Sequence, residues 1–268
     1  MTGSPVLVGI DGAAPAEAAL DWAVDEARRR RAPLRIVHVL EWKPVASHEL
    51  SGQTYVEVIW ASGNALVGAA ARRAREIAPE LAVRSDTLLG HPAEILTDAT
   101  RDAQLLVLGH RGRGGFAGML LGSVSERVAG HASCPVAVVR GRSAPDGPVV
   151  VGIDDSPAAE YVLGSAFEAA AIRASRLVVV RTPERAPADT TLIEQDLAPW
   201  REKYPNVAVE ARLTCAAPAA ALVEASNGAR LVVVGSRGRG PVRAALLGST
   251  GLHLLRQAAC PVLIARHR

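Results

Sequence analysis

The chain has 268 residues and is 49% hydrophobic and 21% charged, which suits one large or two small globular domains and argues against a disordered chain. The formal net charge is only +3 and 3% of residues are aromatic, so a nucleic-acid partner is not expected. No apolar run approaches the roughly 20 residues that cross a bilayer, and no secretory leader is recognisable. Three cysteines without metal-ligand spacing indicate a reduced, cytoplasmic protein without a metal site.

The first half of the chain is predicted to alternate strands with helices. Residues 6–10 form a short apolar run between polar residues, which is typical of a strand buried on both faces of a parallel sheet. Pro15 suits the first turn of a helix. Further strands are predicted at 34–40, 83–88, 105–108 and 136–139, and further helices at 65–78, 93–101 and 123–130. This order predicts an α/β fold with a parallel sheet covered by helices.

The second half repeats the first. PVLVGIDGAAPAEAAL near the start matches PVVVGIDDSPAAEYVL from Pro148, and Asp154 follows Asp11 by 143 residues. LLVLGHRGRGG matches LVVVGSRGRGP, with Gly235 126 residues after Gly109, so the first half holds 17 extra residues, which we assign to 41–64. The repeat predicts a domain over residues 1–141, a linker at 142–146, and a second domain over 147–268.

Glycines follow the fourth predicted strand of each half in the pattern G-x2-G-x9-G-S. The pattern comprises Gly109, Gly112, Gly122 and Ser123 in the first half, and Gly235, Gly238, Gly248 and Ser249 in the second. Glycines let a backbone approach a ligand closely, and the N-terminus of a helix attracts anions, so the pattern favours a phosphate cradle. The alternative is that the glycines only form turns and that Ser123 with Glu126 makes a capping box.

An aspartate follows the first predicted strand of each half, Asp11 in VGIDG and Asp154 in VGIDD. This position is the sheet edge at which open α/β folds bind ligands, so the carboxylate could accept hydrogen bonds from a ribose or a base. The alternative is that Asp11 caps the following helix. In the second half Ser156 and Pro157 offer capping chemistry, so we expect Asp154 to be free for another role. The chain has neither a Walker A loop nor a GxGxxG fingerprint.

GID after the first strand, the doubled glycine motif and a closing CPV strand resemble the universal stress protein family, and the chain looks like a tandem member. The resemblance implies two Rossmann-like, doubly wound domains, each with a five-stranded parallel sheet in the order 3-2-1-4-5. It also implies an adenine nucleotide at the carboxyl edge, because the glycine motif marks the ATP-binding members. In the first repeat the residues expected at ATP are Gly9, Asp11, Val39, Gly109, Arg111, Gly112, Arg113, Gly114, Gly115, Gly122, Ser123 and Val124. In the second they are Gly152, Asp154, Val180, Gly235, Arg237, Gly238, Arg239, Gly240, Gly248, Ser249 and Thr250.

The leading interpretation is an ATP-binding stress or regulatory protein, with or without Mg²⁺, that hydrolyses ATP slowly at most. No catalytic residue is assigned, because neither glycine loop holds a lysine and His110 of the first loop is Ser236 in the second. A metal-dependent nucleotide hydrolase or transferase and a nucleotide-free interaction module stay open as alternatives. The two halves are expected to pair with each other, a homodimer and an unknown protein partner are left open, and no membrane partner is expected.

Overall fold

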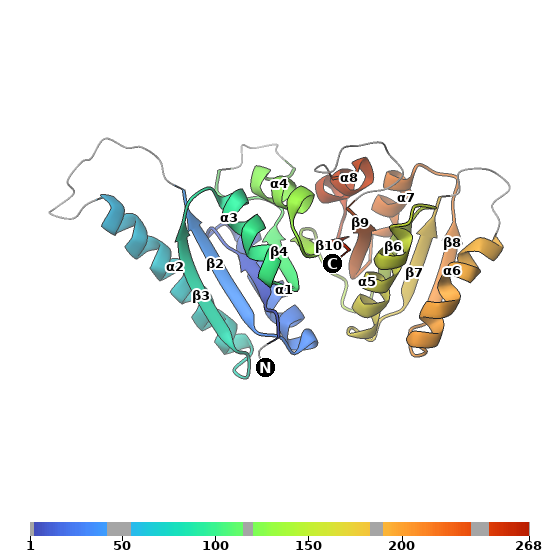
Figure 1. Cartoon of the computed structure of the whole chain (residues 1–268), viewed down its shortest axis with the longest axis horizontal. Helices are drawn as coiled ribbons and strands as arrows, with labels where there is room; N and C mark the ends of the chain where they lie inside the picture. The colour runs from blue at the N-terminus through green and yellow to red at the C-terminus, as the bar shows by residue number, and fades with distance from the viewer. Residues whose placement is uncertain (1–2, 42–54, 115–119, 183–189, 237–246, 268) are drawn as a thin grey trace. The chain divides into compact units, whose positions relative to one another are not determined.

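The computed structural model describes residues 3–41, 55–114, 120–182, 190–236 and 247–267. The chain forms two compact units: unit 1 comprises Met1–Val128 and Ala132–Cys134, and unit 2 comprises Ala129–His131 and Pro135–Arg268. In both units strands alternate with helices (Figure 1), so the predicted α/β class is confirmed.

The elements follow one another twice in the same order. The first repeat contains β1 (Val6–Gly9), α1 (Ala14–Arg30), β2 (Leu34–Leu40), α2 (Tyr55–Ile77), β3 (Val83–Leu89), α3 (Pro92–Ala99), the 3₁₀ turn η1 (Thr100–Asp102), β4 (Leu105–Gly109), α4 (Ser123–His131) and β5 (Val136–Val139). The second contains β6 (Val149–Ile153), α5 (Ala159–Ala171), β7 (Leu177–Arg181), α6 (Thr190–Lys203), β8 (Val209–Leu213), α7 (Pro218–Ala225), β9 (Leu231–Gly235), α8 (Ser249–Gln257) and β10 (Val262–Ala265).

In unit 1 the strands lie parallel in the order β3-β2-β1-β4. Every residue of β1 and β4 is buried, which explains why both strands are continuous apolar runs. Val37, the neighbour of Gly9, and His38 are consecutive in β2 and therefore point to opposite faces. Gly63 of α2 lies over His38, whereas Leu96 of α3 lies over Gly9, so α2 and α3 cover opposite faces of the sheet.

Unit 2 contains the complete parallel order β8-β7-β6-β9-β10, which confirms the predicted 3-2-1-4-5 topology. Strand β5, which belongs to the first repeat in sequence, lies in this unit and pairs antiparallel with β10. The arginine after β5, Arg140, donates to the carbonyl oxygen of Leu255 at 2.6 Å, near the C-terminus of α8. A cation suits this helix end, because the last carbonyl groups of a helix carry partial negative charge.

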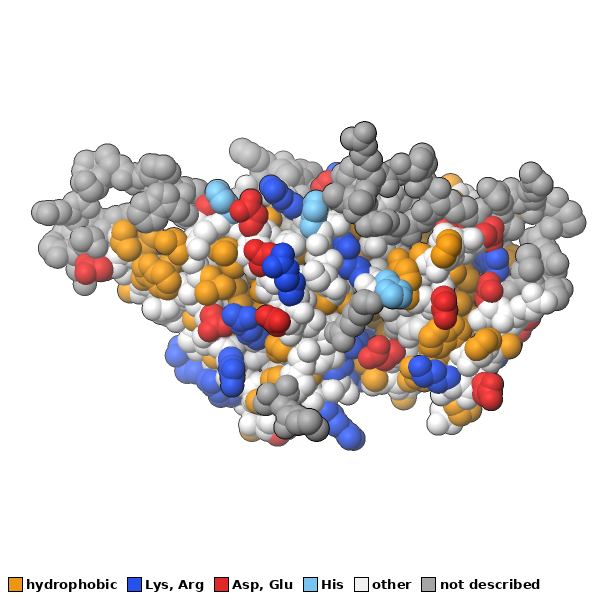
Figure 2. Space-filling model, in the orientation of Figure 1, with side chains coloured by type: hydrophobic (Ala, Val, Ile, Leu, Met, Phe, Trp, Pro, Cys, Tyr) orange, Lys and Arg blue, Asp and Glu red, His pale blue; other side chains and the backbone are white. Residues whose placement is uncertain are grey.

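The helix predicted at 65–78 begins ten residues earlier, at Tyr55, inside the segment that we assigned to the extra residues. Of the rest of that segment, Glu41 is described and residues 42–54 lie outside the described ranges. Val56 and Val58 are both exposed in the first turns, and Figure 2 shows hydrophobic side chains gathered over this end of α2. Apolar residues lie on more than one side of the helix here. The first turns of α2 therefore lack the 3.6-residue apolar period by which a helix is predicted from the sequence.

The core is aliphatic, as the composition predicted. The largest fully buried side chains are leucines and isoleucines, such as Leu7 and Ile36, with Phe167 as the single aromatic residue among them in the described ranges. Valine and leucine fill the space between sheet and helices without polar atoms, so polar side chains collect at the ends of the strands.

Candidate functional site

The carboxyl ends of β1 and β4 lie next to each other in unit 1, because the two strands are parallel neighbours. Asp11 follows β1, and the glycine loop follows β4. The sequence-predicted residues of the first repeat therefore meet at one edge of the sheet, which is where ligands bind in open α/β folds.

Asp11 holds the glycine loop against the start of helix α1. Its Oδ2 accepts a hydrogen bond from the backbone N–H of Arg113 at 2.7 Å, and its Oδ1 accepts one from Ala13 at 3.0 Å. A Cβ atom on Gly112 would lie 2.5 Å from the same Oδ2, so a side chain at this position would displace the Asp11 carboxylate from the loop. Each carboxylate oxygen thus accepts one backbone hydrogen bond from the protein itself. The N-cap of α1 is Ala13 and has no side-chain cap, so Asp11 bonds to the residue at the helix start without capping the first turn.

The other described glycines of the loop differ in what a side chain at their position would meet. A Cβ atom on Gly109 would lie 2.6 Å from the carbonyl oxygen of Pro15, so Gly109 is needed for close packing of β4 against α1. A Cβ atom on Gly122 would make only an ordinary contact, 3.4 Å from the Cα of Arg111, and one on Gly114 would meet nothing within 4 Å. Among the described glycines of this loop, Gly114 therefore has open space beside it, while Gly122 is in contact with the loop backbone but could carry a methyl group without a clash.

Helix α4 begins differently from the predicted capping box. Its N-cap is Gly122, which offers no side-chain hydrogen bond, and Ser123 is the first helical residue. The N–H of Glu126 donates instead to the carbonyl of Gly122 at 3.0 Å. The buried hydroxyl of Ser125 donates to the carbonyl of Gly109 at 2.7 Å and ties this helix to the end of β4. The first turn of α4 is left without a side-chain cap, as a helix that receives an anion would be.

Two arginines stand in the described part of the loop. Arg113 Nη1 lies 3.4 Å from the carbonyl oxygen of Asp11, and Arg111 Nε donates to Nε2 of His110 at 3.2 Å. Both arginines are exposed, so they can also reach an anion in front of α4.

The remaining predicted residues of the first repeat lie along the same edge. Gly9 is buried, and its missing side chain leaves space for Leu96 and Leu108, so its role is packing. Val39 and Val124 are half-buried, and Ser123 is exposed. Gly115 lies outside the described residues.

Val39 and Val180, which we assigned to matching pockets, are not equivalent. Gly9 pairs with Val37 in the first repeat, and Gly152 pairs with Val180 in the second. The counterpart of Val180 is therefore Val37, two residues before Val39. The two valines cannot contact corresponding parts of two bound nucleotides.

The edge in the second repeat uses its aspartate differently. Asp154 Oδ1 accepts hydrogen bonds from the N–H and the hydroxyl of Ser156, at 3.1 and 2.5 Å. The expectation that Ser156 would leave Asp154 free is wrong, because the serine donates both its N–H and its hydroxyl to the aspartate and does not cap the helix. The N-cap of α5 is Ala158, which has no side-chain cap.

The second glycine motif is described in part. Gly248 is the N-cap of α8, again without a side-chain cap, and its N–H donates to Ser236 O at 3.0 Å, as that of Gly122 does to His110 O at 2.8 Å. Gly152 leaves space for Leu222, a Cβ atom there lying 2.4 Å from Leu222 Cδ1. Gly235 and Thr250 are half-buried and Ser249 is exposed. Arg237, Gly238, Arg239 and Gly240 lie outside the described residues.

The sequence analysis missed Arg181, at the end of β7. Its side chain is 8% exposed and forms ion pairs with Asp155 and with Asp196 of α6, the latter at 2.9 Å. Its counterpart is His38, whose Nδ1 lies 2.8 Å from the carbonyl oxygen of Ile10. The sequence signal that could have identified Arg181 is a single charged residue at the end of an otherwise apolar strand. The two repeats therefore differ in charge beside their aspartates.

Two of the cysteines are packed in the core. Cys134 and Cys260 are buried, and burial raises the pKa of the Cys260 thiol to about 12, so a reactive thiolate is disfavoured there. Within the described ranges, no group of three or more His, Cys, Asp or Glu side chains could hold a metal ion. No helix among those residues is long and apolar enough to span a membrane.

The chain is similar to known proteins over nearly its whole length. The model of the universal stress protein family matches residues 4–140 and 180–266. The universal stress protein Rv2005c of Mycobacterium tuberculosis is 36% identical, over 97% of this chain and 96% of that protein. A universal stress protein from Archaeoglobus fulgidus has the same fold, with a TM-score of 0.78 at 19% identity over 99% of this chain and 97% of that one. Two further universal stress proteins, solved with cAMP and with dAMP, have TM-scores of only 0.39, too low to indicate what this chain binds.

Proposed function

Since the chain belongs to the universal stress protein family, we propose that its first repeat binds an adenine nucleotide, foremost ATP, at the carboxyl edge of β1 and β4. The bound nucleotide would set conformation or the choice of a protein partner in a stress response. The resemblance of the doubled glycine motif to that of ATP-binding family members supports this proposal.

The observation that carries the proposal is the glycine N-cap of α4, which lies against the backbone of the loop that contains Arg111 and Arg113. Gly122 at this N-cap makes no side-chain cap, a Cβ atom there would lie 3.4 Å from the Cα of Arg111, and Gly114 of the same loop has open space beside it. Arg111 and Arg113 stand within the same loop. Backbone N–H groups, a helix N-terminus and guanidinium groups together suit the phosphates of a nucleotide.

The nucleoside would share Asp11 with the protein. Each oxygen of Asp11 accepts one backbone hydrogen bond, from Ala13 and from Arg113, and a carboxylate oxygen can accept a second, so a ribose or base donor could bond to Asp11 beside them. A nucleoside held in this way would contact the same carboxylate that holds the loop at Arg113.

The second repeat should bind more weakly. Asp154 is held by Ser156, and Gly251 replaces Ser125, so the hydroxyl bond that ties α4 to Gly109 has no counterpart in α8. Mg²⁺ would be held chiefly by phosphate oxygens, because the described residues offer no cluster of ligands for it. Without a lysine or a shared general base in the loops, turnover should be slow.

Calorimetric titration of ATP into the wild-type chain and the Gly122→Ala variant tests the proposal. The added methyl group meets only an ordinary protein contact, so the variant should fold normally but lose at least tenfold in ATP affinity. Gly68→Ala in α2 is the matched control, because the same change remote from the edge should leave ATP binding unchanged.

The other interpretations predict other outcomes. Absence of nucleotide in the purified protein together with no binding at millimolar ATP would support an interaction module instead. Several turnovers per minute with Mg²⁺ would support a hydrolase. Unchanged ATP affinity in a folded Gly122→Ala variant would show that the phosphates are not bound at this position.

A further inference from the structure

The arginine that follows the last strand of each repeat binds a helix of the other repeat. Arg140, after β5, donates from Nη1 to the carbonyl oxygens of Leu254 and Leu255 near the end of α8, at 3.2 and 2.6 Å. Arg266, after β10, donates from Nη2 to the carbonyl oxygen of Ala129 in α4, at 2.5 Å. Both arginines are half-buried, and all the residues of these contacts belong to unit 2.

The two contacts are equivalent in the repeat. Arg266 follows Arg140 by 126 residues, and Leu255 follows Ala129 by the same number, which is also the spacing between the two glycine motifs. The carbonyl groups are among the last four of α4 and α8, which have no hydrogen-bond donor inside the helix. Each arginine thus supplies donors and a positive charge at a helix end that carries partial negative charge.

Strand pairing explains why the arginines are exchanged. Strands β5 and β10 are antiparallel, with Val262 opposite Val138 and Ile264 opposite Val136. The end of β5 therefore lies beside the start of β10, which follows α8 in the chain, and the end of β10 lies beside the start of β5, which follows α4. An arginine directly after either strand consequently reaches the helix that precedes the other strand.

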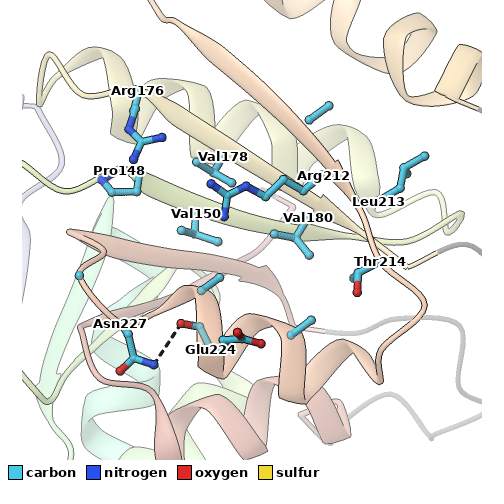
Figure 3. Close-up of a pocket in the computed structure, with 14 residues that line it drawn as sticks. Pro148, Val150, Arg176, Val178, Val180, Arg212, Leu213, Thr214, Glu224 and Asn227 are labelled. Atoms are coloured by element: carbon cyan, nitrogen blue, oxygen red, sulfur yellow. Dashed lines mark hydrogen bonds between the residues drawn. The ribbon is translucent and has the colours of Figure 1, made fainter.

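The turn after α8 is also held by its own repeat. The N–H of Ala259 donates to the hydroxyl of Ser226 at 2.9 Å. Ser226 is the C-cap of α7, the helix that lines one side of the pocket in Figure 3. The carbonyl oxygen of Ala259 accepts the N–H of Arg142 at 2.8 Å, two residues after Arg140. The end of α8 is thus fixed both by its own repeat and by the chain that carries Arg140.

The other ends of α4 and α8 carry the glycine N-caps. Each helix has nine residues and is about 13 Å long at roughly 1.5 Å per residue. Its backbone hydrogen bonds make so short a helix move as one body, so a contact at the C-terminus also sets the position of the N-terminus. The start of α4 is tied to Gly109 by the hydroxyl of Ser125, whereas α8 has Gly251 at that position.

We propose that Arg140 and Arg266 are positioning residues exchanged between the repeats, each holding the N-terminus of the other repeat's helix where phosphate binds. This inference rests on the proposed nucleotide function and adds that neither site is complete within its own repeat. Helix α8 should depend more on its arginine than α4 does, because Arg140 binds two carbonyl groups and α8 lacks the serine hydroxyl.

Calorimetric titration of ATP into the full-length Arg266→Met variant tests the proposal. Methionine fills much of the same space but donates no hydrogen bond. The tighter ATP site, identified as the one that Gly122→Ala weakens, should lose about three- to tenfold in affinity, the range expected for a half-buried cation at a helix end. Arg266→Lys should recover most of this loss, because an ammonium group can donate to the same carbonyl oxygen.

Arg140→Met makes the same change at the equivalent position and should act on the other site. The ratio of the weaker to the tighter site's dissociation constant should therefore increase in Arg140→Met and decrease in Arg266→Met. Arg142→Met is the matched control, because this neighbouring arginine is exposed and should leave ATP binding at both sites unchanged.

Three results would overturn the exchange of arginines. They are wild-type ATP affinity in a folded Arg266→Met variant, equal weakening of the tighter site by both methionine variants, and a lysine variant that binds no better than the methionine one. Failure of the proposed function has a different signature. In that case the wild-type chain binds no ATP, or Gly122→Ala binds it with unchanged affinity.

Discussion

The first repeat joins the helices on one face of its sheet through an ion pair, whereas the second joins the corresponding helices through aromatic rings. Asp21 of α1 binds Arg73 of α2 at 2.7 Å. At the position of Asp21 the second repeat has Gly164, and the missing side chain admits Trp200 of α6, whose Cη2 would lie 2.6 Å from a Cβ atom there. One position in the repeat thus decides between a polar and an apolar helix contact.

The aromatic contact extends into the core of the second repeat. Phe167, which is fully buried, lies 6.0 Å from Trp200 and 5.8 Å from Tyr204 between ring centroids. Lys203 lies over the ring of Trp200 at 5.3 Å. Exposed ion pairs contribute little to stability, while buried aromatic side chains contribute much. The comparison teaches that two copies of one fold can depend on different forces.

The largest expected effect comes from Phe167→Ala. Removing this ring should lower the free energy of unfolding by about 3–5 kcal/mol, because a cavity replaces buried aromatic surface. Arg73→Ala, which breaks the corresponding exposed contact in the first repeat, should cause no measurable change. Urea unfolding followed by circular dichroism measures the free energy of unfolding of both variants. Equal losses in the two variants would contradict the claim that the two helix pairs depend on different forces.

Asp11→Ala should weaken nucleotide binding by about one to two decades, since a charge-assisted hydrogen bond contributes roughly 1.5–3 kcal/mol. Asp154→Ala should have less effect, because Ser156 holds that carboxylate. Calorimetry with adenosine and with ATP, with and without EDTA, checks both. Adenosine binding that survives Asp11→Ala intact would refute a nucleoside contact and favour a metal-dependent role.

Gly109→Ala should lower the free energy of unfolding by about 1–3 kcal/mol, because its Cβ atom would press on the backbone of Pro15, 2.6 Å away. Gly122→Ala should leave unfolding unchanged and affect only ligand binding. Thermal unfolding of the two variants without nucleotide separates the packing glycine from the ligand glycine. A destabilised Gly122→Ala variant would contradict this division.

The smallest effect is expected at the cysteines. Burial raises the pKa of Cys260 from 9.0 to about 12, so the folded chain keeps this proton longer than the unfolded chain does. Its contribution to stability should therefore be intact below pH 9 and should fall as the pH rises from about 9 toward 12. Mass spectrometry after iodoacetamide treatment at pH 8 should find exposed Cys215 alkylated and buried Cys260 protected. Alkylation of Cys260 in the folded chain would contradict this.

The strands could be predicted from the sequence, because apolar runs such as Val6–Gly9 and Leu105–Gly109 are buried on both faces and carry their own signal. Their order in the sheet came from the resemblance to the universal stress protein family. The repeat then predicted the second domain from the first. The start of α2 could not be predicted, since Val56 and Val58 are apolar yet exposed and break the helical period. The position of the aspartates and glycines at one sheet edge also followed from the sequence, because parallel strands end at the same edge.

What those residues contact was decided only by the tertiary structure. Gly109 is required by the backbone of Pro15, and Gly112 lies against the carboxylate of Asp11, in each case an atom about a hundred residues away in the chain. The sequence alone determined which residues are glycine, but it does not contain the distances that make a side chain impossible there.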